Sequence, residues 1–335
     1  MEGNRIYPTE MKQNYPSFGA LVKSVVISAS FPDTMHSADA LVQALRLAAG
    51  EGFYDTVEFF LEDGERPAFA RIRKELDRFA KPSVFLAGAH LKSRRLNLGS
   101  LNDGHRRHAI SETKRLIDQA YFFGSSLMLI TSGQTLDSEE ERNASFALLA
   151  ESLKELCDYA ERRAEGQVLQ ITLEFFNDHG EPHFLVGPTP AAQKLAEVLA
   201  ADYGNFGITF DLSHVIQLGE NPAVSLERLA PYVRHVHLAN CYLKDALHPL
   251  YGDKHPPFDL EDGEMGREDV FAFLLELERQ GFFGRREAWT MGIEVIPPSS
   301  ADAHDIYRKT TSLYKGLWER LQQRQREQLW KEAER

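Results

Sequence analysis

Short apolar runs alternate with longer amphipathic stretches along the chain. Eight of these runs are rich in β-branched and aromatic residues, which is typical of buried strands. They lie at 24–30, 55–60, 83–88, 126–133, 168–176, 206–211, 233–239 and 290–296. Because nearly every position in these runs is apolar, the pattern predicts strands buried on both faces, as in a parallel sheet covered by helices.

The stretches between the runs have the apolar periodicity and the end signals of helices. We predict helices at 37–50, 111–124, 138–166, 189–200 and 267–281. Ser37 and Thr189 are suitable N-caps, and Pro190 suits the first helical position. Glycines close the other ends, since glycine adopts the left-handed conformation that follows many helices.

Eight strands that alternate with helices predict an α/β protein with a (β/α)8 barrel. The alternative is an open doubly wound sheet, but no G-x-G-x-x-G motif follows the first run. The whole chain, 1–335, is predicted to be one domain. Its charged amphipathic tail from about 306 to 335 suits the last barrel helix and an extension, with a subunit contact as the second interpretation.

Composition and charge narrow the function classes. The 335 residues are 43% hydrophobic and 26% charged, which is ordinary for a globular protein. An excess of 50 acidic over 38 basic residues argues against a nucleic-acid partner. Two cysteines cannot build a disulfide framework, and no apolar run approaches the ~20 residues that span a bilayer. These features predict a cytoplasmic protein without a membrane partner.

Four consecutive predicted strands carry an ionisable residue near their carboxyl ends: Glu174, Asp211, His237 and Glu294. Singly, Asp211 could cap a helix, His237 could be a core histidine and Glu174 could pair with an arginine. Together, at one barrel mouth, three carboxylates would repel one another unless a cation lay among them. This ligand set predicts one divalent metal ion, Mn²⁺ first, with Mg²⁺, Co²⁺ and Zn²⁺ as further candidates.

The stretches LEFFN (173–177), FDLSH (210–214), HVHL (235–238) and IEV (293–295) carry a resemblance to a known family. With them, the chain resembles the sugar isomerase and epimerase branch of the xylose isomerase-like barrel superfamily, which includes the D-tagatose 3-epimerase type. The resemblance implies that the same four residues bind the metal and that Glu174 and Glu294 also act as acid and base. It further implies that His214 and Asn177 contact substrate.

The sequence departs from that pattern after the strand at 233–239. Asn240 stands where the resembling enzymes often have Asp, and Lys244 is the nearest base where they have Arg. A lysine cannot copy the bidentate fork of an arginine, so Lys244 is a substrate-binding candidate of a different kind. The long loop at 241–266 is where the resemblance implies a substrate-contacting histidine, and His255 is our candidate, with a solvated loop as the alternative.

Two more residues could face the mouth and bind sugar hydroxyls. Glu58 lies on the second predicted strand, and His90 follows the third. For Glu58 the alternative is a pair with an arginine outside the barrel. The basic stretch at 94–108 could bind a phosphate, although a solvated surface suits it better.

The leading functional hypothesis is a metal-dependent sugar isomerase or epimerase that removes a proton next to a carbonyl of a keto sugar or a related polyhydroxy compound. The alternatives are a metal-dependent lyase, namely an oxo-sugar-acid decarboxylase or a C-glycoside-cleaving subunit, an apurinic-site endonuclease, and a non-catalytic sugar-binding subunit. The expected partner is a small sugar, and the resemblance implies a homo-oligomer, either a dimer or a tetramer.

Overall fold

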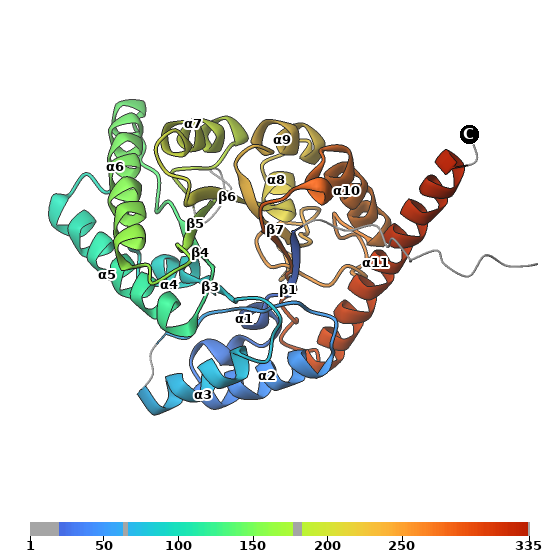
Figure 1. Cartoon of the computed structure of the whole chain (residues 1–335). Coiled ribbons are helices and arrows are strands. Elements are labelled where there is room, and N and C mark those ends of the chain that lie inside the picture. The colour runs from blue at the N-terminus through green and yellow to red at the C-terminus, as the bar shows by residue number, and fades with distance from the viewer. Residues whose placement is uncertain (1–19, 63–65, 177–182, 334–335) are drawn as a thin grey trace, which may run out of the picture.

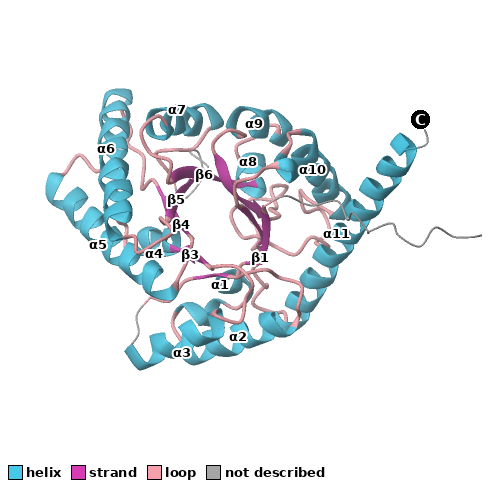
Figure 2. Ribbon diagram, viewed as in Figure 1, coloured by secondary structure: helices cyan, strands magenta, loops and turns pink. Residues whose placement is uncertain are grey.

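Eight parallel strands surround a central axis in the computed structural model, which describes residues 20–62, 66–176 and 183–333 (Figures 1 and 2). The strands are β1 (Leu21–Val25), β2 (Glu58–Phe59), β3 (Val84–Leu86), β4 (Leu127–Thr131), β5 (Gln170–Glu174), β6 (Phe206–Asp211), β7 (Val233–Leu238) and β8 (Trp289–Ile293). They pair in the order β1-β8-β7-β6-β5-β4-β3-β2. A parallel bridge between Val26 and Glu58 joins the two ends of this order, so the barrel is nearly closed.

The pairing of the first strand with the last confirms the predicted barrel. β1 and β8 pair in parallel, from Leu21 with Trp289 to Val25 with Ile293. An open doubly wound sheet has two free edges instead. Because all strands run in the same direction, their carboxyl ends meet at one mouth, which is where the active sites of such barrels lie.

The longer helices lie outside the strands (Figure 2). They are α2 (Ala38–Gly50), α3 (Arg66–Leu76), α5 (Asp103–Phe123), α6 (Glu139–Arg163), α7 (Thr189–Ala200), α9 (Pro222–Leu229), α10 (Arg267–Arg279) and α11 (Ala303–Ala333). Two ends follow the predicted signals. The Ser37 hydroxyl accepts a hydrogen bond from the Ala40 N–H at 3.2 Å, and Gly124 has a φ of 69° after α5.

Short helices begin directly at the carboxyl ends of three strands. They are α1 (Ile27–Ser30) near β1, α4 (Ala87–Ser93) after β3 and α8 (Leu212–Gln217) after β6. The predicted strands at 24–30 and 83–88 are therefore too long at their carboxyl ends. An apolar run that is buried on every side cannot distinguish a strand from a helical turn, which explains these errors. Two 3₁₀ turns, η1 (Pro32–Met35) and η2 (Phe282–Gly284), complete the elements in the described residues.

Two helix boundaries and one N-cap also differ from the prediction. Helix α5 begins at Asp103 rather than 111, because the Asn102 side chain caps it by accepting from the His105 N–H at 2.9 Å. Helix α6 ends at Arg163, before the expected glycine. Thr189 is inside α7 rather than its N-cap, since its N–H and hydroxyl both bond to the Glu220 carboxylate.

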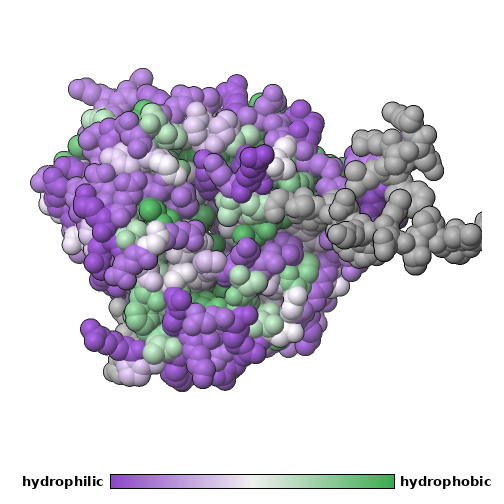
Figure 3. All heavy atoms as spheres, in the orientation of Figure 1, coloured by the Kyte–Doolittle hydropathy of each residue, from purple (hydrophilic) through white to green (hydrophobic). Residues whose placement is uncertain are grey.

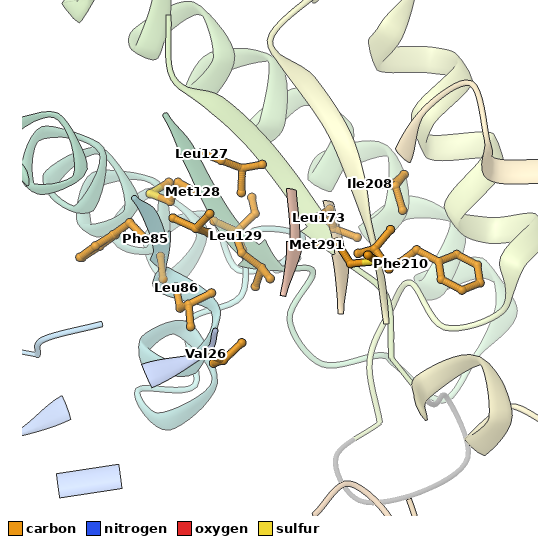
Figure 4. Packing of buried hydrophobic residues seen from close by; sticks show 14 of the residues in the cluster. Val26, Phe85, Leu86, Leu127, Met128, Leu129, Leu173, Ile208, Phe210 and Met291 are labelled. Atoms are coloured by element: carbon orange, nitrogen blue, oxygen red, sulfur yellow. The ribbon is translucent and has the colours of Figure 1, made fainter. Parts of the chain in front are cut away.

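Buried hydrophobic residues form one cluster that extends from Val25 to Leu321. Figure 4 shows Leu86 near Val26, whereas Phe85 points away toward the surrounding helices. The Phe85 ring contacts Phe59 edge-on, with ring centroids 5.7 Å apart, and stacks against Phe123 of α5. Hydrophilic residues cover most of the face seen in Figure 3, and hydrophobic residues show between them toward its centre.

The last helix packs on the barrel and then projects beyond it (Figure 1). The buried Tyr314 hydroxyl of α11 donates to the Met291 carbonyl of β8 at 2.9 Å. Tyr54 and Thr311 share a second buried hydrogen bond of 2.9 Å.

The single-domain assignment stays a prediction. None of the helices in the described ranges combines the length and the apolar character needed to cross a membrane.

We expect Phe85→Ala to lower the free energy of unfolding by about 3–5 kcal/mol, because it removes a fully buried ring between a strand and α5. Chemical denaturation measures this change. Leu247→Ala, at a side chain that is 92% exposed, is the control and should leave stability within about 0.5 kcal/mol of the wild type. Equal stability of the two variants would contradict the packing described here.

Candidate metal centre

Four side chains converge at the mouth of the barrel. Glu174 ends β5, Asp211 ends β6, His237 lies in β7 and Glu294 follows β8 directly. One nitrogen or oxygen atom from each lies within 4.8 Å of those of the other three. The strand register contributes to this, since Asp211 pairs with His237 across β6 and β7. The structure thus brings together all four predicted metal ligands.

His237 is at the centre of the cluster. Its Nδ1 atom lies 2.9 Å from Glu294 Oε2, 3.2 Å from Glu174 Oε1 and 3.7 Å from Asp211 Oδ2. Burial disfavours the charged imidazolium, but the surrounding carboxylates outweigh burial and hold the pKa of His237 well above its usual value. The same excess of negative charge attracts a cation.

The two carboxylate oxygens of Asp211 have different surroundings. Its Oδ1 atom accepts from the Ser213 N–H and from the Ser213 hydroxyl, both at 2.7 Å, and so caps α8. Its Oδ2 atom is buried and has no hydrogen-bond partner in the described structure. Burying a carboxylate oxygen without a partner costs free energy, so this atom is suited to bind a group that the protein chain does not itself supply, such as a cation.

The donor set fits a divalent metal ion. Three carboxylates and one imidazole match the ligand preferences of Mn²⁺, Mg²⁺, Co²⁺ and Zn²⁺ in proteins. The free Asp211 Oδ2 and the His237 Nδ1 both face the other carboxylates. Glu174, Asp211, His237 and Glu294 are therefore the residues that could hold the ion.

A second polar group lies beside the first. Asp253 Oδ1 lies 3.2 Å from His214 Nε2 and 2.8 Å from His255 Nε2. Burial opposes the charge on both imidazoles, but nearby carboxylates raise the pKa of His214 to about 9 and that of His255 to about 10. Asp211, His214 and His255 also lie close enough to form a further cation site. His255 has a φ of 41°, which is strained for a non-glycine residue.

A cavity of about 230 Å³ connects these groups. The acids and histidines that line it are Glu174, His214, His237, Asp253, His255 and Glu294. Further lining residues are apolar: Val26, Met35, Phe60, Leu86, Leu129 and Ile296. Lys92 reaches the cavity from α4 and pairs with Asp253 at 3.0 Å. The cavity therefore combines an ionisable side with an apolar side.

The other predicted substrate residues fare differently. His214 and His255 line the cavity, as expected, but His90 does not. The immediate start of α4 after β3 turns His90 outward, whereas Ala89 and Lys92 of the same helix line the cavity. Lys244 is exposed and pairs with Asp262, so it is also absent from the cavity lining. Asn177 lies outside the described residues.

Glu58 is the largest departure from the prediction. It is 0% exposed and lies inside the barrel, away from the cavity lining and from the arginines proposed as its alternative partners. Its Oε2 atom lies 2.9 Å from His237 Nε2 and 3.0 Å from His235 Nε2. Burial raises the pKa of Glu58, but the two imidazoles outweigh burial and hold this pKa well below its usual value. Direct substrate contact is therefore the wrong interpretation for Glu58.

Sequence reasoning overlooked the role of Asp253. The length of the loop at 241–266 indicates a functional segment. Asp253 does not follow a strand, however, so the argument that selected the other acids does not select it. The D-x-H pattern of Asp253 and His255 was the available signal, because residues two apart in an irregular loop can turn toward the same neighbour. No motif in the sequence marks Lys92 as a residue of the cavity.

The basic stretch at 94–108 contributes to a separate surface pocket. Its polar lining comprises His90, Arg94, His105, His108, Glu112 and Arg115. Both arginines are already paired, Arg94 with Glu62 at 2.8 Å and Arg115 with Glu112 at 2.5 Å. These pairs neutralise the positive charge on which phosphate binding would depend.

Comparison with known proteins identifies the family of the chain. A family model described as a xylose isomerase-like TIM barrel matches residues 45–314. The chain belongs to the xylose isomerase-like TIM barrel family. No curated protein matches the chain.

Solved structures of this family share the fold with the chain at low identity. A D-tagatose 3-epimerase-like protein superposes with a TM-score of 0.66 at 18% identity, covering 90% of this chain and 99% of that one. The 3-keto-D-glucoside 4-epimerase YcjR from E. coli has a TM-score of 0.61 at 14% identity, covering 89% and 99%. An IOLI protein with a binding zinc atom has a TM-score of 0.63 at 17% identity, covering 88% and 97%.

We expect Asp211→Asn to weaken Mn²⁺ binding by more than about tenfold, because it removes a buried negative charge while the amide oxygen still caps α8. Isothermal titration calorimetry measures the dissociation constant. Asp262→Asn, at an exposed carboxylate outside the cavity, should bind Mn²⁺ as the wild type does. Unchanged affinity of Asp211→Asn would exclude Asp211 from the ligand set.

Proposed function

We propose that the protein is a divalent-metal-dependent isomerase or epimerase that acts on a keto sugar or a related polyhydroxy carbonyl compound. The observation that carries the proposal is the set of three carboxylates and one imidazole on consecutive strands, beside a cavity at the barrel mouth. The fold neighbours support it, since their names include a tagatose 3-epimerase-like protein and a keto-glucoside epimerase.

Glu174 and Glu294 are the residues that we assign to proton transfer. Both line the cavity, and they approach His237 Nδ1 from β5 and from the end of β8. Carboxylates on two sides of a bound substrate can remove a proton next to a carbonyl and return it on the other face. A bound divalent ion would supply electrostatic stabilisation of the negative charge that develops on the substrate oxygens.

His214 and His255 are assigned to substrate binding. Asp253 holds the Nε2 atoms of both rings, so His214 Nδ1 is left without a hydrogen-bond partner in the described structure. This nitrogen lies 3.9 Å from Glu174 Oε1, on the ionisable side of the cavity. It is therefore suited to a hydroxyl group of a sugar next to the carbon that loses its proton.

The native metal is proposed to be Mn²⁺, because three carboxylate oxygens and one imidazole suit this ion, although the same ligands also accept Zn²⁺. One structural neighbour is named for its zinc atom. Assembly as a dimer or tetramer and a cytoplasmic location stay predictions.

A metal-dependent lyase is the second candidate. The apolar side of the cavity, formed partly by Met35, Phe60 and Leu86, favours a substrate with an apolar substituent next to its sugar. Elimination of such a substituent needs a base, and His214 or His255 lies beside the ionisable side. Release of an aglycone or of CO₂ without epimerisation would select this candidate.

We expect the Mn²⁺-loaded protein to incorporate solvent deuterium into recovered ketose, because both reaction directions pass through loss of a C–H proton. Mass spectrometry of a ketose and keto-glycoside panel in D₂O measures incorporation. Glu174→Gln and Glu294→Gln should each reduce the exchange rate by about 100-fold or more, since each removes a proposed acid or base.

Glu261→Gln is the control for these variants, because Glu261 is exposed and outside the cavity. It should exchange at the wild-type rate. Metal content is measured for every variant, so that loss of the ion is separated from loss of proton transfer. Absence of exchange across the panel by the loaded wild type would overturn the isomerase proposal.

A further inference from the structure

Glu58 connects one side of the barrel to the metal centre on the other. It lies on β2, whereas His237 lies on β7. The Val26–Glu58 bridge brings β2 next to β1, so β1 and β8 stand between these strands on the shorter way around the barrel. The side chain therefore crosses the barrel interior beneath the cluster, where it is 0% exposed. An ionisable group at such a site is costly unless its partners satisfy it.

Each oxygen of Glu58 faces a donor. Oε1 accepts from the Ser24 hydroxyl at 2.5 Å. Oε2 lies 2.9 Å from His237 Nε2 and 3.0 Å from His235 Nε2. The two Nε2 atoms also lie 2.8 Å from each other. An ionised carboxylate only accepts hydrogen bonds, so a proton on each Nε2 atom lets both rings donate to Oε2.

Gly292 of β8 leaves the space that Glu58 occupies. A Cβ atom at this position would collide with Glu58 Oε1 and would lie 3.1 Å from Ser24 Oγ. Gly292 also pairs with His237 across β7 and β8. The strand next to His237 is therefore without a side chain at the point where the carboxylate passes.

His235 is consistent with the same proton arrangement. It is 0% exposed, and its Nδ1 atom has no hydrogen-bond partner in the described structure. A proton on Nε2 leaves a bare nitrogen at Nδ1, whereas a proton on Nδ1 would be a buried N–H without an acceptor. His235 then acts as a second donor that keeps Glu58 in place.

We propose that Glu58 is a positioning residue, which keeps a proton on His237 Nε2 and so directs Nδ1 toward Glu174, Asp211 and Glu294, where its lone pair is available to a metal ion bound among them. The proposal rests on the metal centre of the proposed function. A carboxylate behind a histidine ligand fixes the orientation of the ring and makes its other nitrogen a better donor. Glu58 itself contacts neither the cavity nor the other carboxylates of the cluster in the described contacts.

The test compares wild type, Glu58→Gln and Ser24→Ala by Zn²⁺ affinity, from competition with a chromogenic chelator, and by NMR of ¹⁵N-histidine in the Zn²⁺-loaded protein. We expect Glu58→Gln to weaken Zn²⁺ binding by about 10- to 100-fold, since an amide does not require a proton on His237 Nε2. The wild type should show His237 bound through Nδ1 with a protected Nε2 proton. That signal should exchange faster or disappear in the variant.

Ser24→Ala keeps the carboxylate and removes one donor, so it stays informative if Glu58→Gln fails to fold. We expect it to weaken Zn²⁺ binding by a few fold and to shift the His237 Nε2 resonance. Glu75→Gln is the matched control, because Glu75 is also a buried carboxylate but pairs with Arg46 and Arg78 far from the cluster. It should change neither measurement.

The outcomes separate the two proposals. A wild type that binds neither Zn²⁺ nor Mn²⁺ overturns the metal centre and the proposed function with it. A wild type that binds Zn²⁺ while Glu58→Gln, or Ser24→Ala if the former does not fold, retains its affinity and His237 spectrum overturns only the positioning role. Loss of affinity together with the altered His237 spectrum supports the role.

Discussion

The convergence of three carboxylates on one face of a single imidazole is the constraint on which the rest of the site depends. Glu174, Asp211 and Glu294 all approach His237 Nδ1 within 3.7 Å. Such crowding of negative charge is unfavourable in a protein interior unless positive charge balances it. The barrel sustains it because each residue stands in or directly after a separate strand, where backbone hydrogen bonds such as that from the Glu294 N–H to the Leu238 carbonyl fix its place.

Acids and histidines also contact one another on both sides of this centre. On the cavity side, Asp253 lies between His214 and His255. On the opposite side, Glu58 lies against His235 and His237. Each acid of this group is therefore in contact with an imidazole, and each of these imidazoles with an acid. The polar residues of the barrel interior form a connected set rather than isolated exceptions to an apolar core.

The sequence predicted the parts of the site that follow from strand periodicity. Glu174, Asp211 and His237 could be found because a charge near the end of a buried strand is unusual and because parallel strands end at one mouth. The contact between Glu58 and His237 could not be predicted in this way, since β2 and β7 are three strands apart around the closed barrel. His90 was misplaced because nothing in its apolar run marks the start of a helical turn.

The loop at 241–266 was beyond periodic reasoning for a different reason. Its course is determined by tertiary contacts, such as the Ile296 N–H that donates to the His255 carbonyl at 2.8 Å. Only a structure shows that this contact, with the strained backbone of His255, turns the ring toward Asp253. The fold class could therefore be predicted from the sequence more completely than the contacts between the side chains at the barrel mouth.

The missing side chain of Gly292 has an evolutionary consequence. Positions 58 and 292 share one small volume inside the barrel, although they lie 234 positions apart in the chain. A larger residue at 292 is compatible only with a shorter residue at 58, so neither position can drift independently. In related chains these two positions should therefore vary as a pair, and a chain that loses the acid should also lose the need for the glycine.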